Sequence, residues 1–469
     1  MTKSDIINTS CTILWVININ NTKFQKRIWK YGFKCLIIFI ITLIFLSLIV
    51  NIPFLTHGLE SSNLTTSAHS GHLFISQDDE QWTTTAMIVA AGVTAPLYCY
   101  IVDTFGRRMG IFTISFVQGV KIVLLLFSPQ NVSENVYNVR LFLHVLAGMS
   151  SGGLFTILPI YIREISVLSG FCTGFMIVLT TLGYVMKLAM PTEVRLYLML
   201  VLVCIQFFSI FLMPESPSFL VMREKYDVSM RLKEDDPNIS SEISNLKDER
   251  DRARSNGKIS VYAIWLDAIK IVFVLYTINI LCGSIIFLDQ DKTLIQLKMS
   301  ADPENILVLS SLMGGSVCCL ICITFLDRKY LLTIGYVIMT LSTGVLAVDT
   351  QVDLTIHSYR MIPVISLGIL VFGYGITWGL PTIIAVEMYN MEIRATFIGI
   401  VYAYSQVIKL LHVLTFRYLE DYVGIYTMFY IFACVNLYGA VYTLFAVPNT
   451  KCKTIKQIEK QLKRPALPA

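Results

Sequence analysis

A short charged motif, D-T-F-G-R-R, lies between two long apolar segments. It runs from Asp103 to Arg108 and places one acid, one glycine and two arginines in a gap too short for a domain linker. Acids and arginines in a turn can form ion pairs, and glycine permits a tight turn and close helix approach. An acid beside a helix N-terminus is stabilised by about 0.3–1 kcal/mol. The motif therefore predicts a polar contact at which Asp103 meets a helix terminus of a neighbouring segment.

The segments that position this motif are strongly apolar. Of the 469 residues, 55% are hydrophobic and only 15% are charged, and the mean hydropathy is +0.65, whereas roughly a quarter of the residues of a soluble domain are charged. Apolar runs of about 20 residues, enough to cross a bilayer, recur along most of the chain. The sequence therefore predicts an all-α, multi-pass membrane protein with twelve transmembrane helices. The predicted spans lie near 35–53, 83–102, 109–128, 138–160, 172–190, 195–213, 266–288, 305–326, 330–349, 361–386, 395–416 and 424–446.

Lysines and arginines in the connections set the orientation. The segment before residue 35 and the tail after residue 446 are rich in lysine, whereas the connection 53–82 has no lysine or arginine and carries four acids. Both ends of the chain are therefore predicted to face the cytoplasm. Sequons at Asn63 and Asn131 then lie outside the cell as candidate glycosylation sites, and the sequon at Asn238 lies inside.

A long polar gap divides the predicted spans into two sets of six. We expect a cytoplasmic N-terminal segment (1–34), a six-helix bundle (35–213), a cytoplasmic linker (214–265), a second six-helix bundle (266–446) and a cytoplasmic tail (447–469). A weak repeat supports this division, because Asp103 and Asp327 follow the second and eighth spans, and Glu164 and Glu387 end the fourth and tenth. Many secondary transporters consist of two such halves with a site between them.

Five motifs, in order along the chain, resemble the major facilitator superfamily. D-T-F-G-R-R resembles the loop between its second and third spans, and 139–165 resembles its fourth span. P-E-S-P-S-F-L at 214–220 resembles the sugar-porter signature, 386–399 the turn after span ten, and 447–459 the tail signature. The resemblance begins near residue 35 and is closest to the insect facilitated trehalose transporters. It implies two six-helix bundles that alternate in access around a central site.

The resemblance also implies an ion-pair layer that links the bundles while the cytoplasmic side is closed. Charges at loop ends can instead serve only to orient the spans. The expected gate and motif residues are Asp103, Gly106, Arg107, Arg108, Arg140, Glu164, Glu215, Asp327, Arg328, Glu387 and Arg394.

Several positions depart from the sugar-porter pattern. The arginine expected seven residues after Glu164 is missing, and the loop after span eight is clipped, so we expect a weaker inner barrier. Most of the amides that bind sugar hydroxyls are also replaced, for example by Ile177, which makes tight glucose binding doubtful. The remaining candidate substrate-binding residues are Asn279, Ser284, Pro381, Thr382, Ser405 and Lys409. Lys409 either extends toward the outer surface or faces a cavity or partner.

These features predict facilitated, uncoupled movement of a small sugar, such as a hexose or trehalose, across the plasma membrane. One alternative is a carrier of another small organic solute, with Lys409 binding an anionic group. Another is a non-transporting sensor or scaffold with a degenerate pocket. No nucleophile, base and orienting group or metal spacing stands out, so we expect no enzyme activity, catalytic residue, metal or cofactor. The formal charge of +5 belongs to the cytoplasmic faces, so the expected partners are a solute and the bilayer and not nucleic acid.

Overall fold

The computed structural model describes residues 77–127, 135–165, 192–212, 215–224, 257–284, 301–352, 361–451 and 455–462, with a few residues between these ranges. All regular elements in these ranges are helices, as predicted. The predicted spans 35–53 and most of 172–190, and the two outer sequons at Asn63 and Asn131, lie outside the described residues.

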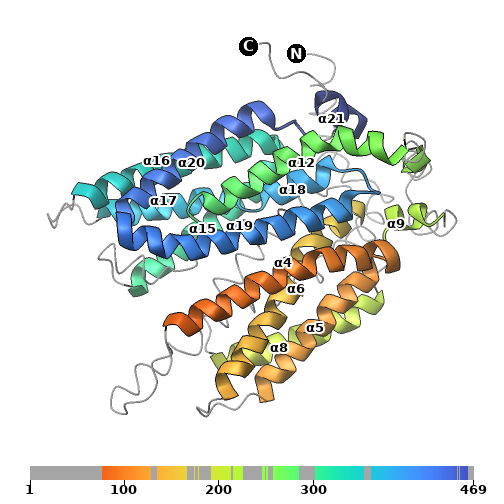
Figure 1. Cartoon of the computed structure of the whole chain (residues 1–469), viewed down its shortest axis with the longest axis horizontal. Coiled ribbons are helices and arrows are strands. Elements are labelled where there is room, and N and C mark those ends of the chain that lie inside the picture. Colours follow the sequence, from red (N-terminus) through yellow and green to blue (C-terminus); the bar gives the residue numbers. More distant parts are fainter. Residues whose placement is uncertain are drawn as a thin grey trace, which may run out of the picture.

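Four long helices of the first half pack as one bundle (Figure 1). They are α4 (Gln77–Phe105), α5 (Arg107–Phe127), α6 (Asn135–Ile165) and α8 (Thr192–Leu212), each overlapping a predicted span. Helix α6 contacts α4 and α5, and α5 contacts α8. Buried apolar side chains on all four helices, including Val102, Ile114 and Ile157, form the core between them. The short helix α9 (Pro217–Met222) follows at the end of the bundle.

The second half forms the other group of helices in Figure 1. Its elements are α12 (Gly257–Leu281), α15 (Ala301–Phe325), α16 (Arg328–Val352), α17 (Met361–Thr377), α18 (Leu380–Met388), α19 (Arg394–Val423) and α20 (Ile425–Ala446). Helix α16 packs against α17 and α20, and α15 packs against α17. Helix α12 begins at Gly257 and not at 266, so its first turns come from the predicted linker. The tail adds α21 (Ile455–Leu462), which packs against α12 with Ile458 buried.

The predicted span 361–386 is two helices and not one. Helix α17 ends at Thr377, and α18 begins at Leu380 with Pro381 in its first turn. Proline has no N–H to donate, and its ring clashes with the carbonyl of the residue four positions earlier, which for Pro381 is Thr377. At the break the N–H of Trp378 donates to the carbonyl of Tyr374 at 3.0 Å, and the carbonyl of Gly379 accepts the N–H of Ile383 at 3.3 Å. Interrupted membrane helices of this kind often lie at the binding sites of transporters.

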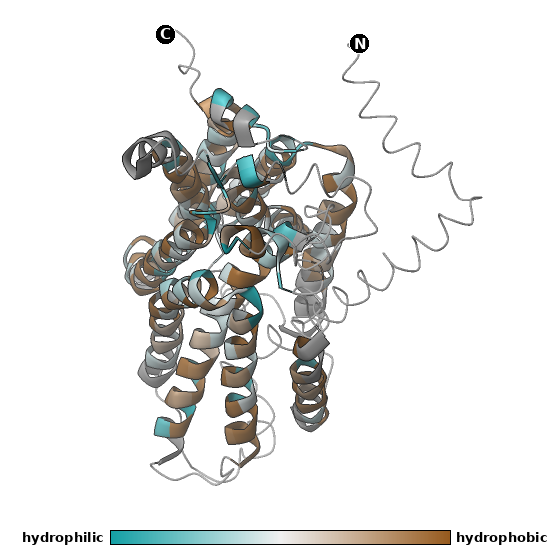
Figure 2. Cartoon of the chain, turned by 90° about the vertical axis from the view of Figure 1, so that its right-hand side faces the viewer, coloured by the Kyte–Doolittle hydropathy of each residue, from teal (hydrophilic) through white to brown (hydrophobic). Residues whose placement is uncertain are grey.

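Seven described helical segments are long and apolar enough to cross a membrane, with α17 and α18 counted together as Ile362–Met388. Tyr197–Phe207 and Ser310–Phe325 are shorter apolar helices. Apolar residues line the helices along most of their length (Figure 2). Many of these side chains point outward, including Leu97, Leu341 and Phe445, which are 57%, 67% and 71% exposed. A helix that is apolar on its outer face as well as on its inner face is suited to lipid and not to water. The chain is a multi-pass membrane protein.

Glycines let α6 lie directly against the backbone of α4. A Cβ atom at Gly148 would overlap the carbonyl oxygen of Met87, and one at Gly152 would lie 2.6 Å from the carbonyl oxygen of Ala91. Membrane helices associate through such small residues, because lipid provides no hydrophobic driving force between helices. The family-like fourth span therefore keeps its glycines for packing in the first bundle.

The Gly148 contact yields a stability prediction. Gly148→Ala should lower the thermal unfolding temperature of the detergent-purified protein, because overpacking a close contact costs about 1–3 kcal/mol. Gly344→Ala is the matched control, since a Cβ atom at Gly344 meets no atom within 4 Å. An equal loss of stability in both variants would contradict the packing role of Gly148.

Candidate functional site

The D-T-F-G-R-R motif forms a tight turn between α4 and α5. Gly106 has a φ of 105°, and its N–H donates to the carbonyl of Val102 at 3.2 Å. Residues other than glycine rarely adopt this conformation. A Cβ atom at Gly106 would also lie 2.6 Å from a carboxylate oxygen of Glu215. Both the backbone conformation and the close neighbour therefore require glycine.

Arg107 is fully buried and holds Glu164 by two bonds. Its Nε and Nη2 atoms each donate at 3.0 Å to a different carboxylate oxygen of Glu164, at the end of α6. Nη1 donates to the carbonyl of Val102 at 3.2 Å, and the guanidinium lies 5.3 Å from the ring centroid of Phe219. Bidentate, charge-assisted pairs of this kind fix geometry as well as adding energy.

The segment after span six holds both ends of this turn. Glu215 Oε1 accepts hydrogen bonds from the backbone N–H groups of Arg107, at 2.8 Å, and Arg108, at 3.3 Å. A carboxylate at a helix N-terminus satisfies free donors and is favoured by the helix dipole. At the other end, Arg223 donates to the carbonyls of Asp103 and Thr104, at 3.3 and 2.6 Å. Sequence reasoning placed Glu215 in an ion-pair layer, whereas its described partners are backbone groups, and it missed Arg223.

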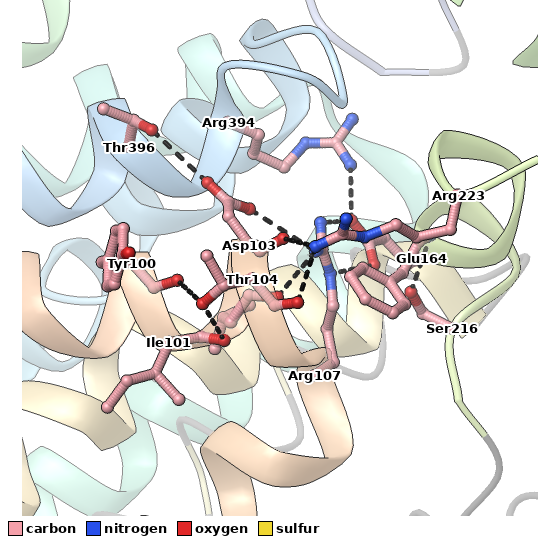
Figure 3. A network of polar contacts seen from close by, with 12 residues as sticks. Tyr100, Ile101, Asp103, Thr104, Arg107, Glu164, Ser216, Arg223, Arg394 and Thr396 are labelled. Carbon is pink, nitrogen blue, oxygen red and sulfur yellow. Dashed lines mark hydrogen bonds and ion pairs between the residues drawn. The ribbon is translucent and has the colours of Figure 1, made fainter.

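Asp103 reaches a helix of the opposite bundle. Its Oδ2 atom accepts a hydrogen bond from Thr396 Oγ1 at 3.4 Å, in the first turn of α19 (Figure 3). Its Oδ1 atom lies 3.5 Å from Arg107 Nη1. Asp103 therefore meets a helix terminus of a neighbouring span and joins the two halves of the chain.

Arg394 makes the ion pair that crosses between the bundles. It starts α19, and its Nη1 atom donates to Glu164 Oε1 at 3.5 Å. Its Nε and Nη2 atoms donate to the carbonyl of Tyr389 at 3.2 and 3.0 Å. The Glu164 side chain is 0% exposed and that of Arg394 is 6% exposed. Glu164 thus lies between an arginine of its own bundle and one of the other bundle.

The second half contains an equivalent of the Arg107–Glu164 pair. Arg328 Nη2 lies 3.1 Å from Glu387 Oε1, and Arg328 Nη1 donates to the carbonyl five residues earlier, at Ile323, as Arg107 does to Val102. Although the loop after span eight is clipped, Arg328 keeps the role of Arg107. Asp327 contributes through its backbone, since its carbonyl accepts the N–H of Leu331 at 3.1 Å.

The two pairs differ in what completes them. The other oxygen of Glu387 accepts a hydrogen bond from Thr450 Oγ1 at 2.6 Å, so the tail fills the place that Arg394 fills at Glu164. The sequence from 166 to 186 contains no arginine or lysine. That segment therefore offers no cation to cross from the first bundle to Glu387.

Arg140 does not belong to this cluster. It lies near the start of α6, whereas Glu164 lies at its end. The 24 residues between them, at about 1.5 Å per residue, separate their backbones by about 36 Å. The prediction that grouped Arg140 with the gate was wrong. It relied on the sequence motif that contains both residues and ignored that they lie at opposite ends of α6.

Some candidate substrate-binding residues gather where α17 and α18 meet α12. Thr382 Oγ1 lies 2.9 Å from the hydroxyl of Tyr276, and Asn279 Nδ2 donates to the carbonyl of Trp378 at 3.4 Å. The Oδ1 atom of Asn279 is buried and has no hydrogen-bond partner among the described residues. Pro381 lies in the first turn of α18, at the same break.

Other candidates bond to their own helices or to different partners. Ser284 and Ser405 donate to the carbonyls of Ile280 and Tyr402, at 2.8 and 2.6 Å. Sequence reasoning missed Thr277 on α12, whose hydroxyl lies 2.9 Å from that of Tyr404 on α19. The signal was an adjacent pair of hydroxyls, Tyr276 and Thr277, in an apolar span. No group of three or more His, Cys, Asp or Glu able to hold a metal occurs in the part of the chain that is described.

Curated relatives of this chain are transporters. The glucose transporter GlcP of Staphylococcus epidermidis is 25% identical over 399 residues, which cover 80% of this chain and 86% of that protein. The facilitated trehalose transporter Tret1 of Bombyx mori is 25% identical over 274 residues, which cover 55% of this chain and 54% of that protein.

Solved structures share the fold. The proton:xylose symporter XylE, a major facilitator superfamily protein bound to 6-bromo-6-deoxy-D-glucose, matches with a TM-score of 0.77 at 17% identity, covering 91% of this chain and 98% of that chain. The inward-open conformation of the xylose transporter XylE from E. coli matches with a TM-score of 0.65 at 16% identity, covering 91% and 99%. The fold of this chain is therefore the major facilitator fold.

The family model described as "Sugar (and other) transporter" matches residues 49–462, which include the Asp103 turn, both buried pairs and the tail. This match covers most of the chain. The chain belongs to the sugar (and other) transporter family.

Proposed function

We propose that this protein is a facilitative carrier that moves a small sugar, a hexose or trehalose, across the plasma membrane by alternating access. The observation that supports this proposal most directly is that Glu164 pairs with Arg107 of its own bundle and with Arg394 of the other. The relatives named for glucose and trehalose transport support a sugar as the solute. The proposed units are the bundles 35–213 and 266–446, with the N-terminal segment, linker and tail in the cytoplasm.

The shared carboxylate is suited to a gate. The contact between Arg394 and Glu164 is a single one at 3.5 Å, and its net contribution is modest because the cost of removing the charges from water offsets much of their attraction. Water that enters between the bundles can therefore replace the Arg394–Glu164 contact at small cost, while Arg107 stays with Glu164 inside its own bundle. The contact between bundles is then reversible, as alternating access requires.

A seam between α4 and α19 extends this closed region. A Cβ atom at Gly399 would lie 2.7 Å from Cys99 Sγ, and one at Gly92 would lie 3.2 Å from the Cβ of Gln406. From Arg394 to Gln406 the seam rises by about 18 Å along α19. The two bundles are therefore in contact from their charged ends toward the middle of the helices, which supports a conformation closed to the cytoplasm.

The break between α17 and α18 supports recognition of hydroxyls. The buried Asn279 Oδ1 has no partner among the residues that the structure describes, so it can accept a hydrogen bond from a solute hydroxyl. The Tyr276–Thr382 pair can exchange its mutual bond for bonds to a solute. Sites that bind through a few buried polar groups discriminate by leaving those groups unpaired when the solute lacks the matching atoms. The proposed activity moves the solute unchanged and needs no chemical step.

Sugar counterflow in reconstituted vesicles tests this function. Vesicles loaded with unlabelled hexose or trehalose should accumulate the labelled sugar transiently, without a proton gradient, and Asn279→Leu should raise the KM by roughly tenfold because it removes one buried polar partner. Protein-free vesicles are the control. The same assay is repeated with a panel of other sugars and organic anions. Absence of flux for every solute in this panel would instead favour a sensor or scaffold.

The gate predicts a change in the reactivity of a native thiol. Cys99 is 2% exposed at the α4–α19 seam. Arg394→Gln removes a charge-assisted contact worth about 1.5 kcal/mol, so the inward-open population should rise roughly tenfold and Cys99 should be alkylated faster by a permeant maleimide. Mass spectrometry of the Cys99 peptide measures the rate.

Two variants make this measurement specific. Arg328→Gln breaks a buried pair within one bundle, so it should lower thermal stability without raising Cys99 labelling, and Cys99→Ala should remove the signal. Equal labelling in Arg394→Gln and the unmodified protein would refute the gate.

Orientation is tested by glycosylation. In cells, Asn63→Gln and Asn131→Gln should each remove one glycosidase-sensitive shift in electrophoretic mobility, because the proposed topology places both residues outside. Asn238→Gln is the matched control and should change nothing, since the linker is placed in the cytoplasm. A glycan on Asn238 would reverse the proposed orientation.

A further inference from the structure

Lys409 lies deep within α19. It is 15 residues from Arg394 at one end of the helix and 14 residues from Val423 at the other. At about 1.5 Å per residue, its backbone is roughly 20 Å from either end, which is more than a lysine side chain can span. The apolar part of α19 ends at Phe416, seven residues beyond Lys409, so the backbone of Lys409 lies about 10 Å inside the outer end of the span.

The lysine lies on the protein-facing side of α19. At 3.6 residues per turn, Lys409 falls within about 60° of buried Ser405, His412 and Phe416 and nearly opposite the exposed side. The exposed side consists of Ile400, Val407, Leu411 and Tyr418, which are 45%, 55%, 53% and 75% exposed. Lys409 is therefore directed away from the lipid.

The neighbours of α19 define where this side points. Tyr404 bonds Thr277 of α12 on one flank, and Gln406 packs on Gly92 of α4 on the other flank. Between these flanks, Tyr402 stacks on Phe155 of α6, with ring centroids 6.0 Å apart. Lys409 lies two turns after Tyr402 on nearly the same face of α19, farther from Arg394. It therefore points between the two bundles, beyond the seam that ends at Gln406.

Lys409 has no acidic partner in the part of the chain that the structure describes. Among the described residues it forms no hydrogen bond or ion pair. The twelve predicted spans contain two acids, Asp267 and Asp349, each at the end of a span, whereas Lys121, Lys187 and Lys409 lie inside spans. Lys409 therefore faces the space between the bundles with no carboxylate of the described residues paired to it.

We infer that the preferred sugar is an acid, with a carboxylate that pairs with Lys409 while its hydroxyls bind near the α17–α18 break. This inference rests on the proposed function and specifies its substrate class. A carboxylate matches the single charge of one lysine, whereas a phosphate carries about −1.5 to −2 and would leave excess charge buried. Hexuronates combine one carboxylate with the ring hydroxyls that Asn279 can bind.

Uptake of labelled hexuronate and of the matching neutral hexose into vesicles tests the inference. In the unmodified protein, hexuronate should compete for transport about 30-fold better than the hexose, because breaking a buried charge pair costs at least that factor. Lys409→Gln should raise the KM for hexuronate by about 30-fold or more and leave that for the hexose nearly unchanged. Lys270→Gln is the control, since Lys270 pairs with Asp267 and its side chain is 73% exposed.

The outcomes separate the two proposals. Transport of the neutral hexose without that of hexuronate overturns the acidic substrate and leaves the sugar carrier standing. Transport of neither overturns both. If Lys409→Gln is unstable in detergent, the competition measured on the unmodified protein decides alone, and preference for a sugar phosphate over hexuronate also overturns the inference.

Discussion

The structure depends on one buried carboxylate that two arginines share. Glu164 is fully buried and could not remain charged without them, since an isolated buried charge is very costly. Arg107 fixes Glu164 to its own bundle through two 3.0 Å bonds, and Arg394 reaches it from the other bundle at 3.5 Å. The two contacts have different roles. The short bidentate pair stabilises the first bundle, and the longer single bond joins the two bundles.

The surrounding residues serve this arrangement. Gly106 allows the turn that buries Arg107, Glu215 caps the N-terminus of α5, and Arg223 binds the carbonyls at the end of α4. In the second half, Arg328 and Glu387 repeat the pair, but a hydroxyl from the tail takes the place of a crossing arginine. The two halves therefore differ. Among the described residues, Glu164 of the first bundle pairs with an arginine of the other bundle, whereas Glu387 of the second bundle does not.

Much of this was accessible from the sequence. Apolar run lengths located the described spans, and the charges at loop ends supplied both halves of each buried pair, because charge burial in a membrane protein demands partners. The sequence does not predict that Glu215 binds backbone N–H groups, because a carboxylate can accept hydrogen bonds from a helix N-terminus as well as from an arginine. It also misassigned Arg140, because a motif records order along the chain and not depth in the membrane. The break at Pro381 was missed because its flanks are continuously apolar.

The hydrogen bond from Thr450 to Glu387 can form only after the tail has been synthesised. Glu387 is made more than 60 residues before Thr450, so during translation the α18 carboxylate has Arg328 but lacks its second partner. Only when the tail has left the ribosome can the hydroxyl close the pair and α21 cover α12. A chain cut before Thr450 would therefore leave one oxygen of the buried Glu387 without the hydrogen bond that Thr450 donates.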